Sequence, residues 1–372
     1  MANEDNGFCS AFPELGFYTL PGHTQTPADM IDEVQLAEKM GMGSAWISER
    51  FDVKEASALA GAACAATQSL FIGTAATNIN LRHPMVTASM ATTLHRLSHQ
   101  RFALGVSRGV GIRADLMGLK KVTNAQLIEF SELMRKLWLG EGVGHDGKLG
   151  QFPYLSMAKW LDDAIAMPFV GFGPKSIALA AQYYDGVILH TFMSDEAVAA
   201  SVKIVRDSAE QAGRDPESVR VWTVLATACD PDEEDYLRKI VARMATYMQA
   251  QGYGELLAKV NDWDQAVIDA FRKDSVVASM LGGIDSVASL EQLQHIRGLI
   301  PEHWLPAAAG SPQQCAERFN DQFRAGADGV IIHASTPSEF TPIIETYKTV
   351  RDNEKFSQRS NQPFLPMMET SA

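Results

Sequence analysis

The feature that most limits the folds open to this chain is a regular alternation of short apolar runs with longer stretches of helical periodicity. The apolar runs are rich in β-branched and aromatic residues and predict eight strands, at 15–20, 45–49, 70–78, 102–106, 167–173, 186–190, 219–228 and 329–334. The stretches that follow them predict eight helices, at 27–40, 55–67, 84–97, 124–139, 174–183, 195–211, 233–251 and 337–350.

Apolar strands that alternate with helices are typical of a parallel sheet covered by helices on both faces. Eight such pairs in one chain favour closure of the sheet into a (β/α)₈ TIM barrel, with a doubly wound open sheet as the alternative. Because barrels routinely exceed the average domain length, we expect residues 1–372 to form a single domain.

Two segments fall outside the repeat. Residues 252–310 predict helical pieces at 262–272 and 284–296, inserted before the eighth strand. Such an insertion commonly covers a binding site, although an added structural layer or an oligomer contact is an equal alternative. The tail at 352–372 is polar with two prolines, and we expect it to pack loosely.

The composition of the chain indicates which kinds of binding partner are unfavourable. The formal net charge of −13 argues against binding to nucleic acid or to an anionic membrane, since both need a positive surface. Neither an apolar run of membrane-spanning length nor a signal peptide is visible. The four cysteines have no paired spacing, which indicates reduced thiols in a cytoplasmic protein and no metal site.

Active-site residues of a barrel lie at the carboxyl ends of its strands and in the loops that follow them. The strongest signal there is GFGPKS, which joins a strand to a helix and contributes Gly171, Phe172, Gly173, Pro174, Lys175 and Ser176. Its glycines let the backbone approach a ligand, and the first amides of the helix can hold phosphate oxygens. The alternative is a tight turn that binds nothing. The pattern matches neither a Walker loop nor GxGxxG.

A second glycine-rich loop, GVSRGVG, follows the fourth strand and offers Gly105, Ser107, Arg108 and Gly109. Two such loops after neighbouring strands suggest an extended anionic ligand across the barrel mouth. The segment 309–312, at the start of another helix, is a third candidate.

The acid–base candidates are Glu49, His23, His190 and His333. Glu49 beside Arg50 could equally form a salt bridge, and a strand-end histidine is often structural. Two histidines at one mouth make a ligand or proton-relay role more plausible. Zinc-ligand spacing and the GxSxG nucleophile motif are both lacking.

Three segments resemble luciferase-like flavin and deazaflavin oxidoreductases: residues 71–109 (FIGTAATN…RHP…LGVSRG), 170–190 (VGFGPKS…GVILH) and 310–334 (GSPQQC…GVIIHA). The resemblance implies a barrel with insertions, a cofactor ring over its mouth, and a phosphate tail held by the two glycine loops and Ser311. It places Thr77 and Asn78 near the ring. Many deazaflavin members carry a non-proline cis peptide in the third strand, and the matching bond here is Ala75–Ala76.

One position departs from the family pattern. Several dehydrogenase members have an acidic residue and then a histidine at the end of the second strand, where this chain has Glu49 and Arg50. An arginine stays protonated and cannot act as a base at neutral pH. It could instead bind an anionic substrate or stabilise a developing oxyanion. This tells against a sugar-phosphate or alcohol dehydrogenase.

Three functions follow from these observations. The first is a coenzyme F420-dependent oxidoreductase that moves a hydride between the deazaflavin ring and a small organic substrate, with Glu49, Arg50, His190 and His333 as catalytic candidates. The second is an FMN-dependent monooxygenase that uses reduced flavin and oxygen. The third is a non-enzymatic relative that retains the barrel. The resemblance also implies a homodimer or a larger homo-oligomer.

Overall fold

The computed structural model describes residues 10–22, 26–51, 53–109, 111–357 and 359–367, and within these the sheet is built from parallel strands around one axis. The barrel strands are β1 (Phe12–Tyr18), β2 (Met42–Ile47), β3 and β4 (Phe71–Thr74, Thr77–Asn78), β5 and β6 (Phe102–Ala103, Val106–Ser107), β9 (Phe169–Val170), β10 (Gly186–Ile188), β11 (Arg220–Cys229) and β13 (Gly329–His333).

The sheet closes on itself. Pairing runs from β5 and β3 through β2, β1, β13, β11, β10 and β9 to β6 and β4. β3 and β4 are consecutive parts of the third barrel strand, and β5 and β6 are consecutive parts of the fourth. The two ends of the pairing order therefore belong to the same two strands, and the sheet forms a closed circle. The predicted eight-stranded barrel is therefore confirmed, with the third and fourth strands each divided into two parts.

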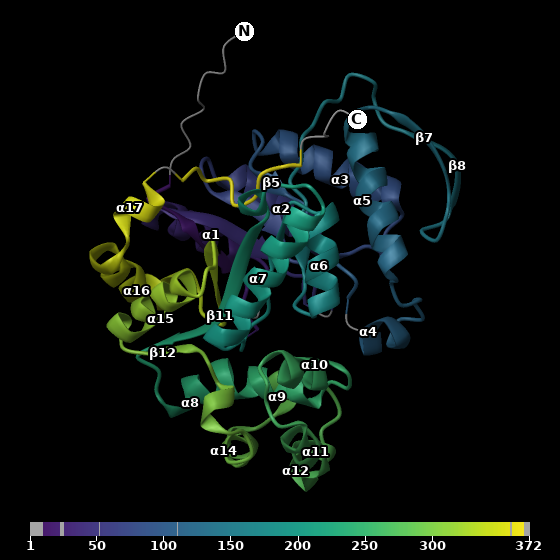
Figure 1. Cartoon of the computed structure of the whole chain (residues 1–372). Helices are drawn as coiled ribbons and strands as arrows, with labels where there is room; N and C mark the ends of the chain where they lie inside the picture. Colours follow the sequence, from purple (N-terminus) through teal and green to yellow (C-terminus); the bar gives the residue numbers. More distant parts are fainter. Residues whose placement is uncertain (1–9, 23–25, 52, 110, 358, 368–372) are drawn as a thin grey trace.

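The helices that surround the barrel in Figure 1 are α1 (Asp29–Met40), α2 (Ala56–Ala66), α3 (Pro84–Leu97), α5 (Asn124–Trp138), α6 (Pro174–Tyr183), α7 (Asp195–Gln211), α15 (Pro312–Arg324) and α16 (Pro337–Val350). Proline at the first helical turn has a backbone angle that suits a helix and no amide to satisfy, which explains why α3, α6 and α16 begin where the sequence predicts.

The helix predicted at 233–251 is present over 233–249, but its assignment as the seventh barrel helix is wrong. The helix that packs between α7 and α16 is α15. Residues 233–249 instead start the insertion, as α8 (Glu233–Tyr236), a π-helical turn at Leu237–Val241 and α9 (Ala242–Gln249). Periodicity identified helices there but not which of them covers the barrel.

The insertion gathers below the barrel in Figure 1. After α9 it continues as α10 (Tyr253–Val260), α11 (Gln265–Lys273), α12 (Ser275–Ala278), α13 (Ile284–Val287) and α14 (Leu290–Arg297), and it ends at β12 (Ala308–Gly310), which pairs with β11. The predicted helix at 284–296 is thus two helices, because Ala288 takes an extended conformation and Ser289 caps the second one.

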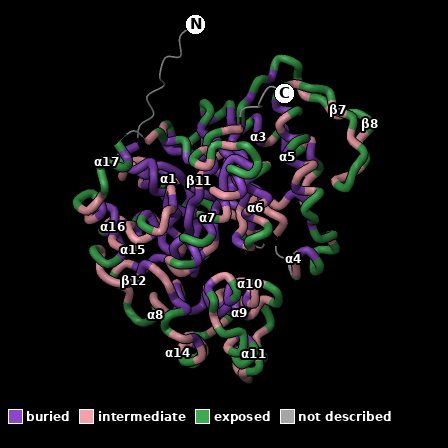
Figure 2. The backbone as a smooth tube through the Cα atoms, viewed as in Figure 1, coloured by how far each residue is buried: buried purple, intermediate pink, exposed green. Residues whose placement is uncertain are grey.

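A hairpin that the sequence analysis did not predict precedes β9. Its strands are β7 (Gly142–Asp146) and β8 (Gln151–Ser156), which pair antiparallel outside the barrel. Figure 2 shows much of this hairpin exposed. The short helix α4 (Gly111–Leu116) lies in the loop after β6.

The end of the chain closes one side of the barrel interior. After α17 (Asn353–Phe356), the tail inserts Phe364 into the barrel, where its ring lies 5.8 Å from that of Trp46 and 5.9 Å from that of Trp222. Phe364 is fully buried, and Asn361 is buried as well. The expectation of a loosely packed tail is therefore wrong for these residues, because one aromatic side chain anchors a segment that reads as polar.

Candidate active site at the barrel mouth

The first glycine turn follows β5 and permits a close approach of two strands. A Cβ atom built on Gly105 would lie 1.9 Å from the carbonyl oxygen of Thr74, so no larger residue fits without a backbone shift. The Thr74 hydroxyl donates a hydrogen bond to the Gly105 carbonyl at 2.8 Å. Gly109 has φ of +73°, a left-handed conformation that favours glycine.

Side chains of the third and fourth strands fix the shape of this turn. The Ser107 hydroxyl donates to the Asn78 side-chain oxygen at 2.7 Å and accepts from the Gly109 amide at 3.1 Å. The peptide bond between Ala75 and Ala76, the position that the resemblance singled out, is cis. The Thr77 hydroxyl is buried and has no hydrogen-bond partner in the described part of the chain.

The second glycine turn leads from β9 into α6. Gly173 is the N-cap residue of α6, and no side chain caps the helix. A Cβ atom built on Gly173 would have its nearest neighbour, a methyl group of Leu256, at 3.5 Å. Pro174 opens the helix, and Lys175 beside it is exposed. Gly171 lies within the turn, where its amide donates to the Ile188 carbonyl at 3.0 Å.

The two turns meet at one rim of the barrel. The Arg108 guanidinium donates to the Ser176 hydroxyl at 3.3 Å and to the Asn124 side chain at 2.7 Å. The strands that carry the turns, β6 and β9, are also direct neighbours. Arg108 therefore connects the first glycine turn to the start of α6, where a cation beside free helix amides could hold an anionic group.

Glu49 lies at the end of β2 with its side chain buried. It forms an ion pair with Arg82, which also pairs with Glu55, and it accepts a hydrogen bond from the Asn78 amide at 3.1 Å. Burial raises the pKa of the Glu49 carboxyl, although Arg82 and the Asn78 amide act in the opposite direction. Glu49 thus forms a salt bridge, which was the alternative to a role as a base, but its partner is Arg82 and not Arg50.

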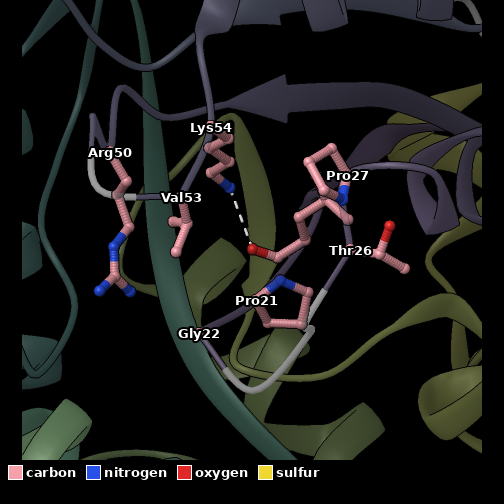
Figure 3. A pocket seen from close by; sticks show the side chains of 8 residues that line it. Pro21, Gly22, Thr26, Pro27, Arg50, Val53 and Lys54 are labelled. Atoms are coloured by element: carbon pink, nitrogen blue, oxygen red, sulfur yellow. Dashed lines mark hydrogen bonds between the residues drawn. The ribbon is translucent and has the colours of Figure 1, made fainter.

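Arg50 points toward the insertion. Its Nη1 lies 4.0 Å from the Asp285 carboxylate, which also pairs with Arg243 at 2.8 Å. Figure 3 shows Arg50, Val53 and Lys54 on the segment after β2, where the Lys54 ammonium donates to the carbonyls of Thr19 and Leu20 at 2.9 and 3.0 Å. Arg50 therefore lies close to two other cations, Arg243 and Lys54.

His190 lies among aromatic rings from the barrel and the insertion. Its ring centroid is 4.8 Å from that of Phe172, 4.5 Å from that of Tyr247 and 5.1 Å from that of Tyr253. Its Nδ1 lies 2.9 Å from the Thr191 carbonyl oxygen. Burial lowers the pKa of His190 to about 4, so the ring is neutral at pH 7.

His333 lies at the end of β13, with its ring 5.2 Å from that of Tyr18. Its Nδ1 is buried without a hydrogen-bond partner among the described residues. Burial lowers the pKa of His333 well below its ordinary value, and Arg243 and His190 lower it further. The two histidines thus share one mouth, and both are neutral at pH 7.

Comparison with known proteins identifies the family of this chain. Residues 13–329 match the family described as luciferase-like monooxygenase. The chain belongs to the luciferase-like monooxygenase family. It is similar to the 5,10-methylenetetrahydromethanopterin reductase of Methanolobus tindarius, with 25% identity over 303 residues that cover 80% of this chain and 87% of the relative. It is also similar to the F420-dependent glucose-6-phosphate dehydrogenase of Mycolicibacterium fortuitum, with 29% identity over 224 residues that cover 56% of this chain and 67% of the relative.

Solved structures agree on the fold. The coenzyme F420-dependent tetrahydromethanopterin reductase of Methanopyrus kandleri superposes with a TM-score of 0.75 at 18% identity, covering 91% of this chain and 99% of that one. The oxygenating constituent of 3,6-diketocamphane monooxygenase from Pseudomonas putida, in complex with FMN, gives 0.64 at 20% identity, covering 95% and 100%. This member of the luciferase-like family is therefore an oxidoreductase with the family's barrel fold.

Sequence reasoning missed the residues that the insertion brings to the mouth of this luciferase-like barrel. Arg243 and Tyr247 lie on α9, Tyr253 begins α10, and Asp285 lies on α13. No local motif marks them, because their neighbours in the site are distant in sequence. Arg82 was visible in the RHP segment, but its pairing with Glu49 was not.

The structure also bears on the remaining predictions from the sequence. Ser311, the third anion candidate, already caps α15 in a reciprocal pair with Gln314, so its hydroxyl and amide are occupied. His23 lies outside the described residues. Within the described ranges, no group of three or more His, Cys, Asp and Glu could hold a metal ion. Among the same residues, no helix has the length and apolar character needed to cross a membrane.

Proposed function

We propose that this protein is a coenzyme F420-dependent oxidoreductase that transfers a hydride between the deazaflavin ring and a small organic substrate. The observation that carries the proposal is the Arg108–Ser176 contact, which joins the two glycine turns at one rim of the barrel. The similarity to an F420-dependent dehydrogenase and to an F420-dependent reductase fold supports the choice of cofactor.

The residues present fit a phosphorylated cofactor. The start of α6 lacks a side-chain cap, Gly173 leaves space in front of it, and Arg108 and Lys175 supply positive charge. Backbone amides at the start of a helix, next to a cation, are a common means of holding phosphate. Gly105, Ser107 and Gly109 would line the path of the tail toward the mouth.

When bound, the deazaflavin accepts or donates the hydride. The protein's own residues hold the substrate and handle the proton. We assign the proton to His333, because its Nδ1 has no hydrogen-bond partner in the described part of the chain. Glu49 is held by Arg82, which suits a role in keeping the strand end in place.

The decisive experiment is a fluorescence titration of the purified protein with F420 and, separately, with FMN. Gly173→Asp and Gly173→Asn form a matched pair, since both side chains can cap α6 but only the first brings a negative charge to the phosphate position. We expect wild type to bind F420 more tightly than FMN. We expect Gly173→Asp to weaken F420 binding at least tenfold, and Gly173→Asn to weaken it much less.

Equal F420 binding by the two Gly173 variants would place the phosphate elsewhere and contradict the assignment. Tighter binding of FMN, with oxygen uptake in the presence of a flavin reductase, would favour the FMN-dependent monooxygenase, whose fold this chain shares. Retention of neither cofactor would favour the non-enzymatic alternative.

We also propose that two copies of this chain associate through α2 and α3. An open groove of about 680 Å³ lies between these helices, and none of its lining residues is charged: Ser57, Ala58, Gly61, Ala62, Met85, Val86, Ser89, Met90, Thr93, Leu94 and Leu97. Val86 and Leu97 are about half exposed. Under two-fold symmetry the small residues of α2 in one copy can receive the larger side chains of α3 in the other.

Light scattering tests this association. We expect a dimer for the wild-type chain and a monomer for Val86→Glu, because the new charge would be buried without a partner. Glu132→Gln, on the neighbouring helix α5, is the control and should remain dimeric. A monomeric wild-type chain would contradict the proposal.

A further inference from the structure

Tyr18 is a buried tyrosine whose hydroxyl has no partner within the described part of the chain. Of the other buried tyrosines in the described ranges, Tyr184 donates a hydrogen bond to a backbone carbonyl at 2.8 Å and Tyr347 donates one to a carboxylate at 3.0 Å. Tyr18 is only 8% exposed, yet its hydroxyl makes no hydrogen bond with a described residue. Because a buried tyrosine hydroxyl usually has a partner, this one indicates a ligand.

The place of Tyr18 in the fold is the mouth of the barrel. It is the last residue of β1, and its side chain belongs to the apolar cluster of the barrel interior, together with Trp46 and Trp222. The neighbouring strand β13 ends at the same level with His333, whose ring lies 5.2 Å from that of Tyr18. The hydroxyl oxygen of Tyr18 is not sealed from solvent, so a ligand in the mouth can reach it.

Two tyrosines of the insertion approach the same mouth. Tyr247 lies on α9 and Tyr253 begins α10, and Figure 1 shows these two helices on the side of the insertion that faces the barrel. The two rings lie 5.5 Å apart, and each also contacts the ring of His190, just after β10. Like Tyr18, neither tyrosine forms a hydrogen bond through its hydroxyl with any residue that the structure describes.

The three hydroxyl groups lie near one another. Burial raises the pKa of Tyr18, and a charge on Tyr247 would raise it further. The pKa of Tyr253 is raised by burial first and then by Tyr247 and Tyr18. Tyr18 and Tyr253 therefore stay protonated at pH 7, and each has one hydrogen to donate. Three converging phenols without an internal acceptor require one from a ligand.

The rings that contact these tyrosines carry no charge at pH 7. Burial lowers the pKa of His190 to about 4 and that of His333 well below its ordinary value, so both imidazoles are neutral. Arg243, whose charge acts on both histidines, is paired with Asp285 at 2.8 Å. An anion bound against these rings would lose its hydration without a counter-ion in contact, so the site favours an uncharged acceptor.

We propose that the substrate presents an uncharged carbonyl oxygen to the hydroxyls of Tyr18, Tyr247 and Tyr253. A carbonyl oxygen has two lone pairs and accepts from such donors without a buried charge. The aromatic rings beside the hydroxyls would pack against a flat, apolar remainder of the molecule. Strand β1 lies on the opposite side of the barrel from β9, which leads into the second glycine turn, so the site is separate from the proposed phosphate position. The proposal rests on the proposed function for the identity of the ligand as the substrate, but recognition of the oxygen can be tested without turnover.

The test is a saturation-transfer NMR titration of the full chain, with and without F420, using three probes of matched shape. Acetophenone carries the carbonyl oxygen, α-methylstyrene has a CH₂ group in its place, and benzoate carries a charged carboxylate. We expect wild type to bind acetophenone, and to bind benzoate more weakly. Tyr18→Phe, Tyr247→Phe and Tyr253→Phe should each weaken acetophenone binding by about threefold to tenfold, as expected for one hydrogen bond, and should change α-methylstyrene binding by less than about twofold. Tyr154→Phe, at an exposed tyrosine of β8, is the control and should bind all three probes like wild type.

The α-methylstyrene probe guards against a purely structural effect, since a distorted mouth would weaken both neutral probes equally, and that result would overturn the proposal. Acetophenone binding that is absent, or unchanged in all three mouth variants, would also overturn it, and tighter binding of benzoate would overturn the assignment to an uncharged group.

An F420 titration of the same variants separates this proposal from the preceding one. We expect the three mouth variants to bind F420 like wild type, and a loss of F420 binding in them would assign the hydroxyls to the cofactor instead. Acetophenone binding that depends on the tyrosine hydroxyls, in a protein that does not bind F420, would support the carbonyl site and reject the proposed cofactor.

Discussion

Glu49 pairs with Arg82, thirty-three positions away, and not with its sequence neighbour Arg50. The pair links the end of β2 to the loop before α3, and the Asn78 amide adds a hydrogen bond from β4. Two consecutive β/α units are thereby tied together behind the mouth. Arg50 faces the insertion instead, where its Nη1 lies 4.0 Å from the Asp285 carboxylate.

Replacing Arg82 with methionine should therefore destabilise the protein. The change leaves a buried carboxylate without its counter-ion, and we expect the free energy of unfolding at pH 7 to fall by about 1–3 kcal/mol. The loss should be smaller at pH 5. The pKa of Glu49, already raised by burial, would rise further without Arg82, and the protonated acid needs no counter-ion. Urea denaturation at the two pH values measures both effects.

The double variant Glu49→Gln with Arg82→Met serves as the control. It removes the buried charge together with its partner, so it should be more stable at pH 7 than Arg82→Met alone. A loss for Arg82→Met that is the same at pH 5 and pH 7 would show that Glu49 is not the group left uncompensated.

The C-terminal tail is expected to contribute strongly to stability through one residue. Phe364 is fully buried against Trp46 and Trp222, so Phe364→Ala should lower the free energy of unfolding by about 3–5 kcal/mol. The neighbouring Leu365 is 40% exposed, and Leu365→Ala should change stability by less than about 1 kcal/mol. Denaturation of the two variants side by side checks this. Similar small losses in both would mean that the tail does not seal the barrel.

The features that the sequence predicted well are those set by local chemistry. Helices α6, α7 and α16 occupy the predicted residues, since proline or a capping serine marks their first turn. Strand limits were predicted less well. For example, the predicted run 167–173 contains a strand of only two residues, Phe169–Val170, because pairing with neighbours and not composition ends it.

The candidate site also has a part that the sequence predicts and a part that it does not. Each glycine turn could be located from its own residues, since the close approach at Gly105 and the uncapped start of α6 depend on neighbours along the chain or in the next strand. The contribution of the insertion could not be predicted. Arg243 meets Arg50 across almost two hundred residues, and no periodicity encodes which face of α9 turns toward the barrel.

The two glycine turns should respond differently to alanine. In Gly105→Ala the new Cβ would meet the Thr74 backbone oxygen at 1.9 Å, so we expect a loss of about 2–3 kcal/mol in the free energy of unfolding. In Gly173→Ala the nearest atom is a flexible Leu256 methyl at 3.5 Å, and we expect a change below about 1 kcal/mol. Thermal and urea unfolding of both variants test the difference. Equal stability would show that the third and fourth strands can separate at no cost.

His190 should make the protein sensitive to acid. Its pKa is lowered to about 4 by burial, whereas in the unfolded chain it takes up a proton near its ordinary value of 6.5. As pH falls from 6.5 to 4, the unfolded state therefore binds more protons than the folded state, and stability is lost over this range. We expect wild type to lose about 2 kcal/mol more than His190→Phe between pH 7 and pH 4, measured by urea denaturation. The exposed His99, changed to asparagine to suit its positive φ, provides a control variant at a surface histidine. If His190→Phe follows the same pH curve as wild type, the neutral imidazole among Phe172, Tyr247 and Tyr253 is not the group that titrates.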